Sequence, residues 1–346
     1  MPTSAPTRRS ASSMPRSVNG EPPVTLQMQT FPAGAKDRGT AAPSVTATVA
    51  VVLVCWNNRA YLEPCLDSLY GAGLRHPFEV VVVDNGSTDG SQDMLRQRFP
   101  QVELVQNDSN VGLGRASNQG IDVTRAPFIL LLNNDTIVTR AALDAMVEYM
   151  AATPDAGAVG GKLLNDDGSV QAEYSNFSTL REEFLIATRI GELIWPGYPS
   201  HHPSGEIRPV DWLSSACLLV RRSALAQVGQ LDESYFIYGD EADLQYRLIA
   251  AGWKVYYLPQ ATTLHFGGRS MDRWRRRKMV YRGKMLFYRK NYGAAREYLL
   301  RGLFGSLTLA KLGLWSLAWL VPSVRARARR EWRSNVDVLR LCLTLD

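Results

Sequence analysis

Cysteine and histidine are scarce in this sequence, and no cluster of histidines surrounds a cysteine. Its 346 residues include four cysteines and four histidines, with no CxxC spacing and no group of histidines around a cysteine. This scarcity argues against a zinc site and against a disulfide scaffold, and it is typical of a reducing compartment. We therefore expect an intracellular protein whose chemistry depends on other residue types.

The first 45 residues lack a hydrophobic period. They consist mainly of Pro, Ser, Thr, Ala and Gly with scattered arginines, and such a segment buries too little apolar surface to offset the entropy lost on ordering. We expect residues 1–45 to be a disordered tail. No apolar core of about 7–15 residues follows the early arginines, so a secretory signal is not expected.

The chain after residue 45 alternates between short β-rich runs and helical patterns. With 45% apolar and 21% charged residues, it has the composition of an ordinary folded protein. The alternation is typical of βαβ units around a largely parallel sheet, and so predicts an α/β fold. Strands are expected within residues 46–56, 78–91, 102–108 and 126–136, and helices over 60–70, 91–99 (with Ser91 as N-cap), 114–124 and 141–152.

Polar side chains follow three of the predicted strands. Asp84, Asn110 and Asp135 each come just after a strand end. The carboxyl ends of parallel strands share one edge of a sheet, and open α/β sheets bind ligands at that edge. These positions therefore predict a nucleotide site.

Five segments follow one another in a recognisable order between Val49 and Gly268. They are VVLVCWNNRAYLEPCLDSL, VVVDNGSTDGS, NVGLGRASNQG, LLNNDT and LDESYFIYGDEADLQYRLIAAGWKVYYLPQATTLHFGG. Together they resemble family 2 glycosyltransferases of the GT-A fold, especially the bacterial rhamnosyltransferase-like members. The resemblance implies a GT-A (Rossmann-like nucleotide-diphospho-sugar transferase) domain over residues 46–268. It also implies an inverting transfer of a sugar from a nucleotide-diphosphate donor to a hydroxyl group of a saccharide or lipid-linked saccharide.

The resemblance assigns the donor nucleotide to two of these segments. Asp84 and Asn85 match the turn that binds the base, where a carboxylate accepts a pyrimidine N–H. Asn110, Arg115 and Asn118 match the loop beneath the nucleotide and sugar, where Arg115 would contact phosphate. Two plainer interpretations stay open: Asp84 as the cap of its own turn, and Arg115 as a solvated residue. The resemblance favours dTDP-rhamnose as donor, with UDP-linked hexoses as the alternative.

The segment LLNNDT matches the strand tip at which the family has a DxD motif. There the last aspartate, Asp135 in this chain, coordinates Mn²⁺ or Mg²⁺ bridging the donor phosphates; such cations often use few protein carboxylates. Asn133 replaces the first acid, and Asn133 and Asn134 are expected to contact the donor. His265 matches a histidine that completes the metal shell or contacts phosphate, and an imidazole favours manganese. An Asx turn and a structural histidine are the alternatives.

The segment FIYGDEADLQYR matches the acidic motif of the family. By register Glu241 is the base that removes the proton from the acceptor hydroxyl, and Asp240 is the second candidate. Arg247 lies four residues after Asp243, a helical spacing that permits an ion pair. An acidic helix N-terminus favoured by the macrodipole is the plainer interpretation. The acceptor side is expected to include Trp212, Ser214, Asp243 and loops within residues 165–210.

The region over residues 269–346 is basic and apolar. Between Arg269 and Arg301 there are twelve Lys or Arg against two acids, which favours an anionic partner. Residues 299–321 are almost entirely apolar, yet Lys311 near the middle would be costly inside a bilayer. An interfacial helix on an anionic membrane and a helical hairpin packed on the catalytic domain are both open. No recognition module suggests nucleic acid.

Two kinds of function are consistent with the sequence. The first is an active transferase at the inner face of a bacterial membrane. The second is a catalytically idle sugar-nucleotide or glycan-binding protein on the same fold, which the missing first acid of the DxD motif supports. A nucleotidyltransferase is a weaker candidate, because WNNRAY stands where its glycine-rich phosphate loop would follow the first strand.

Overall fold

The computed structural model describes residues 47–194, 205–267 and 272–344. The expected tail over residues 1–45 and part of the 165–210 region lie outside the described residues. The strands are β1 Val49–Cys55, β2 Phe78–Asp84, β3 Glu103–Gln106, β4 Phe128–Asn133, β5 Thr136–Ile137, β6 Ala156–Leu164, β7 Val170–Ala172, β8 Arg208–Val210, β9 Cys217–Arg221 and β10 Lys254–His265. The helices before residue 268 are α1 Arg59–Gly71, α2 Ser91–Arg98, α3 Leu113–Asp122, α4 Arg140–Ala152, α5 Leu180–Thr188, α6 Ile190–Ile194, α7 Arg222–Val228 and α8 Asp240–Ala250.

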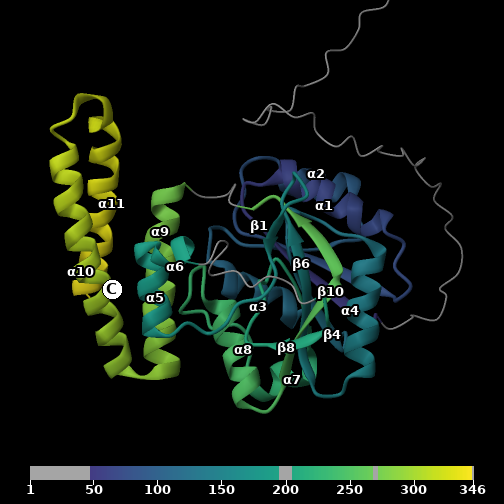
Figure 1. Cartoon of the computed structure of the whole chain (residues 1–346). Helices are drawn as coiled ribbons and strands as arrows, with labels where there is room; N and C mark the ends of the chain where they lie inside the picture. The colour runs from purple at the N-terminus through teal and green to yellow at the C-terminus, as the bar shows by residue number, and fades with distance from the viewer. Residues whose placement is uncertain (1–46, 195–204, 268–271, 345–346) are drawn as a thin grey trace, which may run out of the picture. The chain divides into compact units, whose positions relative to one another are not determined.

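The main sheet has the strand order β3-β2-β1-β4-β9-β6-β10-β5 (Figure 1). Strands β3, β2, β1 and β4 pair in parallel, and β6 pairs in parallel with β10. Strand β9 is antiparallel to both β4 and β6, so β6 and β10 run in the same direction as β1. The carboxyl ends of β1, β2, β4, β6 and β10 therefore share one edge, as the sequence predicts for a mostly parallel sheet.

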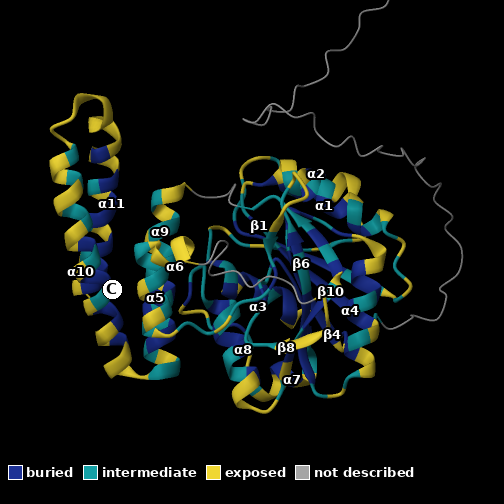
Figure 2. Ribbon diagram, in the orientation of Figure 1, coloured by how far each residue is buried: buried dark blue, intermediate teal, exposed yellow. Residues whose placement is uncertain are grey.

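The core has two layers, one on each face of the sheet (Figure 2). Successive residues of a strand point to opposite faces. Thus Leu130 in β4 packs with the layer that contains α1, α2 and α4, whereas Leu131 packs with the layer that contains residues of α7 and α8. Because helices cover both faces, the central strands are continuous apolar runs rather than alternating ones. This burial holds the strand ends in fixed positions.

Two local features differ from the sequence prediction. The N-cap of α2 is Gly90, in the left-handed conformation with φ 81°, and Ser91 is the first helical residue. A left-handed residue costs least at glycine, so the expected Ser91 cap is wrong. Strand β6 was not predicted, because its glycines obscure the strand pattern. A Cβ atom on Gly161 would lie 1.7 Å from the carbonyl oxygen of Ala261, so only glycine fits beside the irregular part of β10.

The region after residue 268 is helical and packs against the acidic motif. It contains α9 Arg273–Phe287, a π-helical turn at Tyr288–Tyr292, α10 Ala294–Ala318, a 3₁₀ turn at Pro322–Val324 and α11 Arg325–Leu343. Asn291 Nδ2 donates to Asp243 Oδ1 at 2.9 Å. A Cβ atom on Gly283 would lie 2.2 Å from the carbonyl oxygen of Tyr238. The helical extension is confirmed, while a domain boundary at residue 268 stays a prediction.

The packing of helix α10 explains why Lys311 occurs within the apolar stretch over residues 299–321. Lys311 Nζ donates to the carbonyl oxygen of Ala187 at 3.0 Å, and burial lowers the pKa of this lysine. Its ammonium group therefore points toward α5 rather than outward. Among the described helices, none is both long and apolar enough to span a bilayer.

Candidate functional site

The carboxylate of Asp135 lies at the shared strand edge beside His265. The antiparallel pairing of β5 with β10 places His265 opposite Thr136, and Phe266 N donates to the carbonyl oxygen of Asp135 at 2.9 Å. As a result, His265 Nε2 lies 3.3 Å from Asp135 Oδ1, and both side chains are mostly buried. The structure thus brings together the two predicted metal ligands.

The hydrogen bonds of His265 indicate which ring nitrogen carries the proton. Gln171 Nε2 donates to the carbonyl oxygen of His265 at 2.8 Å and to Asn165 Oδ1 at 2.9 Å. Its Oε1 must therefore accept from His265 Nδ1, at 2.6 Å. In the neutral ring Nε2 is then an acceptor, and Asn133 Nδ2 lies 3.2 Å from it. In that neutral form, Nε2 and Asp135 Oδ1 are both acceptors and lie 3.3 Å apart.

This arrangement fits a divalent cation. Two lone pairs at that separation repel unless a proton or a cation lies between them, and an imidazole with a carboxylate is a suitable ligand pair for manganese. The orienting contact from Gln171 is of the kind that fixes metal-bound histidines. Within the described part of the chain, no group of three or more His, Cys, Asp or Glu side chains is placed to hold an ion. Substrate oxygens would have to complete the shell, and the metal assignment stays a prediction.

Asp84, at the end of β2, both caps its turn and keeps one oxygen free. Its Oδ1 accepts from Ser87 N at 2.9 Å and from Gln92 Nε2 at 2.7 Å. Its Oδ2 is buried and has no hydrogen-bond partner among the described residues. A buried acceptor without a partner is costly, and a donor N–H of a nucleotide base would satisfy it. The capping interpretation and the base-binding interpretation are therefore compatible.

The amides of Asn85 and Asn110 form a network that shapes the loop after β3. Asn85 Nδ2 contacts Asn110 Oδ1 and the carbonyl oxygen of Gly112, each at 3.3 Å, and Asn107 Nδ2 donates to Asn85 Oδ1 at 2.9 Å. Asn110 Oδ1 also accepts from Gly112 N at 3.0 Å. These side chains position the loop, and their contact with a nucleotide stays a prediction.

Two other predicted donor residues have their polar atoms occupied within the protein. Asn134 Oδ1 accepts from Asn58 Nδ2 at 2.6 Å, and its Nδ2 donates to the carbonyl oxygen of Val54 at 2.7 Å. Asn118 exchanges hydrogen bonds with the backbone of Leu231 at 2.8 and 3.1 Å. Arg115 is exposed, with its Nε 3.9 Å from Glu233 Oε2. Their direct roles in donor binding stay predictions.

The acidic motif begins α8, after Gly239 in a left-handed conformation. Asp240 is 1% exposed, and its Oδ1 has no partner among the described residues. Burial raises the pKa of Asp240 well above its usual range, and the adjacent Glu241 acts in the same direction. Glu241 is only partly buried, and its Oε2 accepts from Gly239 N at 3.1 Å. The two neighbouring carboxyl groups thus differ in environment, because Asp240 is enclosed and Glu241 is partly accessible. Which of them acts as the base stays a prediction.

The strand tip and the acidic motif lie close together in space. Asn133 and Asp240 line one small cavity, together with Ser117 and Ser215. Tyr238, a non-glycine residue with φ 66°, lies within electrostatic range of both Glu241 and Asp135. Burial raises the pKa of Tyr238, Arg276 opposes this effect, and the two carboxylates reinforce it. The predicted metal ligand and the predicted base thus both act electrostatically on one tyrosine.

The predicted acceptor residues are held by neighbouring groups. The ion pair of Asp243 with Arg247 is confirmed, with Nε to Oδ2 at 2.8 Å. Because Asp243 Oδ1 also accepts from Asn291, this carboxylate braces α8 against the C-terminal region. Trp212 Nε1 donates to the carbonyl oxygen of Asn176 at 3.1 Å, and Ser214 Oγ accepts from Ala216 N at 3.2 Å. Acceptor contacts by these residues stay predictions.

Three residues at the site were not predicted from the sequence. Gln171 lies in β7, which pairs with β6 across an irregular register, so no local pattern marks it. Tyr238 precedes the glycine that caps α8. Its left-handed backbone conformation could not be predicted from the residue type. Arg276 is one of many basic residues in α9, and only the packing of that helix separates it from its neighbours.

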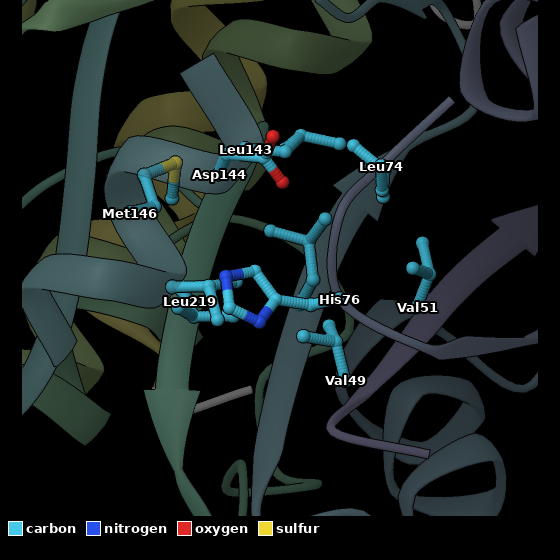
Figure 3. A pocket seen from close by; sticks show the side chains of 10 residues that line it. Val49, Val51, Leu74, His76, Leu143, Asp144, Met146 and Leu219 are labelled. Carbon is cyan, nitrogen blue, oxygen red and sulfur yellow. The ribbon is translucent and has the colours of Figure 1, made fainter. Parts of the chain in front are cut away.

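A second, mainly apolar cavity is unrelated to these groups. It is lined mainly by apolar side chains, and His76 and Asp144 also line it (Figure 3). It includes Val49, the first residue of β1, whereas Asp84 and Asp135 follow strand ends. It therefore lies toward the opposite end of β1 from the predicted nucleotide edge.

Comparison with known proteins identifies related sequences. The family model described as glycosyl transferase family 2 matches residues 50–228. A Mycobacterium tuberculosis protein named N-acetylglucosaminyl-diphospho-decaprenol L-rhamnosyltransferase is 35% identical over 246 residues, which cover 66% of this chain and 79% of that protein. The O-antigen biosynthesis protein RfbC of Myxococcus xanthus is 30% identical over 229 residues, covering 64% of this chain and 17% of that protein.

Solved structures show the same fold at low sequence identity. The mannosyltransferase PcManGT from Pyrobaculum calidifontis, in complex with GDP-Man and Mn²⁺, superposes with a TM-score of 0.53 at 16% identity, covering 87% of this chain and 88% of that chain. GalNAc-T7 with UDP, GalNAc and Mn²⁺ gives a TM-score of 0.50 at 15% identity, covering 71% of this chain and 50% of that chain. These likenesses confirm the predicted α/β architecture of the GT-A type.

Proposed function

We propose, from the premise that this chain belongs to glycosyl transferase family 2, that it transfers L-rhamnose with inversion to a lipid-linked saccharide. The donor is a nucleotide-diphosphate sugar, with dTDP-rhamnose favoured over a UDP-hexose. The observation that supports the reaction most directly is the cavity lined by both Asn133 and Asp240, because these residues belong to the strand tip that contains Asp135 and to the acidic motif that contains Glu241. In a sugar transfer, the site of the donor phosphates and the base that activates the acceptor must lie close together.

Glu241 is the base in this proposal. An inverting transfer is a single displacement, in which the acceptor hydroxyl loses its proton as its oxygen attacks the sugar carbon. Asp240 is buried beside Glu241, and burial raises the pKa of its carboxyl group, which favours the more accessible Glu241 as the base. No covalent intermediate on the protein is needed.

Asp135 and His265 are the proposed ligands of a divalent cation, Mn²⁺ or Mg²⁺. When bound, the cation would offset the negative charge that develops on the departing nucleoside diphosphate. Gln171 keeps the imidazole of His265 in the orientation that presents Nε2 to this position. Asn133, in place of the usual first acid, contributes an amide rather than a second charge.

The proposed acceptor is a saccharide on a lipid diphosphate. The named substrate of the Mycobacterium tuberculosis relative, an N-acetylglucosaminyl-diphospho-decaprenol, is the main support for this class of acceptor. A lipid-linked acceptor lies in a membrane, so we propose peripheral contact with an anionic bilayer at the cytoplasmic face.

The hairpin tip, defined as residues 314–324, provides a surface of suitable chemistry for that contact. Its exposed apolar side chains are Leu314, Leu317, Trp319, Leu320, Val321 and Val324. Exposed arginines follow it at the start of α11, at positions 325, 327, 329 and 330. Apolar insertion combined with flanking positive charge is typical of interfacial helices on anionic lipid.

The decisive experiment follows nucleoside diphosphate release from a panel of nucleotide sugars with added Mn²⁺ or Mg²⁺ and a lipid-diphosphate saccharide. We expect transfer by the wild type, and a loss of about 10² to 10⁴-fold in kcat for Glu241→Gln, the usual contribution of a general base. Asp135→Asn should abolish the stimulation by metal. A protein that binds the nucleotide, as seen by thermal stabilisation, yet releases no diphosphate would instead be the idle binding protein.

A further inference from the structure

Arg276 differs from the other partly buried cations of α9 because it lacks an acidic partner. Arg277 Nη1 lies 3.0 Å from Glu331 Oε2, and Lys284 Nζ lies 2.6 Å from Glu183 Oε2. Arg276 is also partly buried, its Nε is shielded from solvent without a hydrogen-bond partner, and no ion pair to it occurs among the described residues. A shielded cation without an anion is costly, and an anionic ligand would remove that cost.

Arg276 lies about two helical turns before Gly283, on the face of α9 that packs against Tyr238. Its positive charge opposes the rise in the pKa of Tyr238, the residue that lies within electrostatic range of Asp135 and Glu241. Helix α9 is held tightly here, because Gly283 packs against the carbonyl oxygen of Tyr238 with no room for a Cβ atom. Arg276 is therefore placed by the fold rather than by a flexible surface position.

The carboxylates near Arg276 would repel an anionic substrate unless a positive charge offset them. An anionic substrate that approaches Glu241 also approaches Asp135, and both carboxylates would repel it. A guanidinium group binds two oxygens of a phosphate at once, which a single point charge does not do. In the part of the chain described, Arg276 is the cation that the structure connects to Tyr238.

We propose that Arg276, together with the Tyr238 hydroxyl group, forms a phosphate subsite that holds the diphosphate of the acceptor lipid while its sugar hydroxyl meets Glu241. This inference rests on the proposed function, because it deepens the acceptor assignment. The acceptor is favoured over the donor because Asp135 and His265 already form the proposed donor-phosphate position. Arg276 instead belongs to the helix that leads through α10 to the hairpin tip.

The test compares Arg276→Gln with Arg275→Gln, an exposed neighbour in the same helix that takes part in no side-chain contact among those described. Two acceptors carry the same sugar, one on a prenyl diphosphate and one as an alkyl glycoside. For Arg276→Gln we expect the KM of the diphosphate acceptor to rise at least about tenfold, equivalent to about 1.4 kcal/mol. The KM of the donor and the rate with the alkyl glycoside should stay unchanged. Arg275→Gln should behave as the wild type.

Two further variants separate binding from structural support. Arg276→Lys, which keeps the charge but not the fork of donors, should recover only part of the acceptor affinity. Tyr238→Phe should weaken acceptor binding less than Arg276→Gln. If Arg276→Gln raises the KM of the donor instead, the subsite belongs to the donor diphosphate and the proposal is wrong. Equal losses with both acceptors, or none with either, would also overturn it.

A binding measurement keeps this inference separate from the transfer reaction. Calorimetry with a short prenyl diphosphate, in the absence of any donor, should show at least about tenfold weaker binding to Arg276→Gln than to the wild type. The corresponding prenyl monoalcohol should bind both proteins equally. If the wild type binds the diphosphate through Arg276 but transfers no sugar, the subsite stands and the proposed function fails. If transfer occurs but the diphosphate binds both proteins equally, the subsite fails.

Discussion

At the scale of single residues, the acidic pair shows how two neighbouring carboxyl groups acquire different roles. Both belong to the first turn of α8, but Asp240 is enclosed, whereas Glu241 remains partly accessible. Burial disfavours the charged form of an acid, so the pKa of the enclosed Asp240 is raised, and the proposed role of base falls to the accessible Glu241. The sequence alone left both candidates open, because residue type does not report burial.

Asp240→Asn is expected to alter stability in a pH-dependent way. The pKa of Asp240 in the folded protein is raised above its unfolded value of about 3.9. Below about pH 4 both states are protonated, and as the pH rises toward the folded pKa the wild type loses stability because ionisation favours unfolding. The variant lacks this group. Its melting temperature relative to the wild type should therefore increase as the pH rises above about 4, until the pH reaches the folded-state pKa of Asp240.

The same variant should retain most of its activity. An amide at position 240 can still donate to Glu241, so we expect kcat within about tenfold of the wild type, in contrast to the larger loss for Glu241→Gln. Melting curves and rates across the pH range check both statements. A constant difference in melting temperature, or activity losses as large as those of Glu241→Gln, would show that Asp240 is ionised and acts as the base.

A residue of the site could be predicted from the sequence when its position follows from the strand, helix or motif that contains it. Asp84 and Asp135 come at or just after strand ends, so periodicity predicts their place at one edge of the sheet. The position of Glu241 was predicted only from the resemblance of its motif to the family. Gln171 and Arg276 reach the site only through tertiary packing, and nothing in their flanking residues marks them. Asn134 is the reverse case. Its position in the motif suggests contact with a ligand, but its amide group is hydrogen-bonded to Asn58 and to the carbonyl oxygen of Val54.

At the scale of elements, the contact between α9 and the acidic motif depends on one glycine. Helix interiors normally disfavour glycine, yet Gly283 lies within α9 because the carbonyl oxygen of Tyr238 occupies the space of a Cβ atom. Sequence periodicity predicts that a helix exists here but does not identify the face that contacts α8. The same applies to β6, whose glycines permit close approach by β10.

Gly283→Ala is expected to destabilise the protein by about 1–3 kcal/mol, because the added methyl group forces α9 away from Tyr238. Activity should fall as well, since Tyr238 and Arg276 shift together. Gly302→Ala in α10 is the matched control, because the space that its added methyl group would occupy is open. It should be neutral or stabilise by up to about 1 kcal/mol. Denaturant melts of both variants measure the difference, and similar effects in the two would contradict the packing argument.

At the scale of the whole molecule, the apolar tip of the α10–α11 hairpin is the surface whose role the sequence left most open. The buried amine of Lys311 resolves the conflict between a lysine and an apolar helix, because the lysine faces Ala187 and leaves the exposed face of α10 apolar. Packing on the catalytic domain and contact with a membrane are thus compatible, since they involve different faces of one helix.

The double variant Leu317→Glu and Leu320→Glu should lose binding to anionic vesicles. These two leucines are 65% and 75% exposed, so the change should leave folding intact while opposing insertion into lipid. Flotation with anionic and with neutral vesicles measures the effect, and wild-type binding should weaken at high salt. Val123→Glu, at another exposed apolar position, should bind as the wild type. Unchanged binding by the double variant, or a concentration-dependent dimer formed through the tip, would refute membrane contact.

The bracing of Asp243 by Asn291 has a practical consequence for engineering. A fragment that stops after β10 would include every motif of the family, yet it would lack the amide that holds α8 and the arginine beside Tyr238. The C-terminal helical region could be exchanged between related transferases to redirect them to other lipid carriers. Such chimeras would need to include Gly283 and Asn291 in the exchanged segment. The C-terminal helical region and the catalytic domain should therefore be kept together in engineered variants.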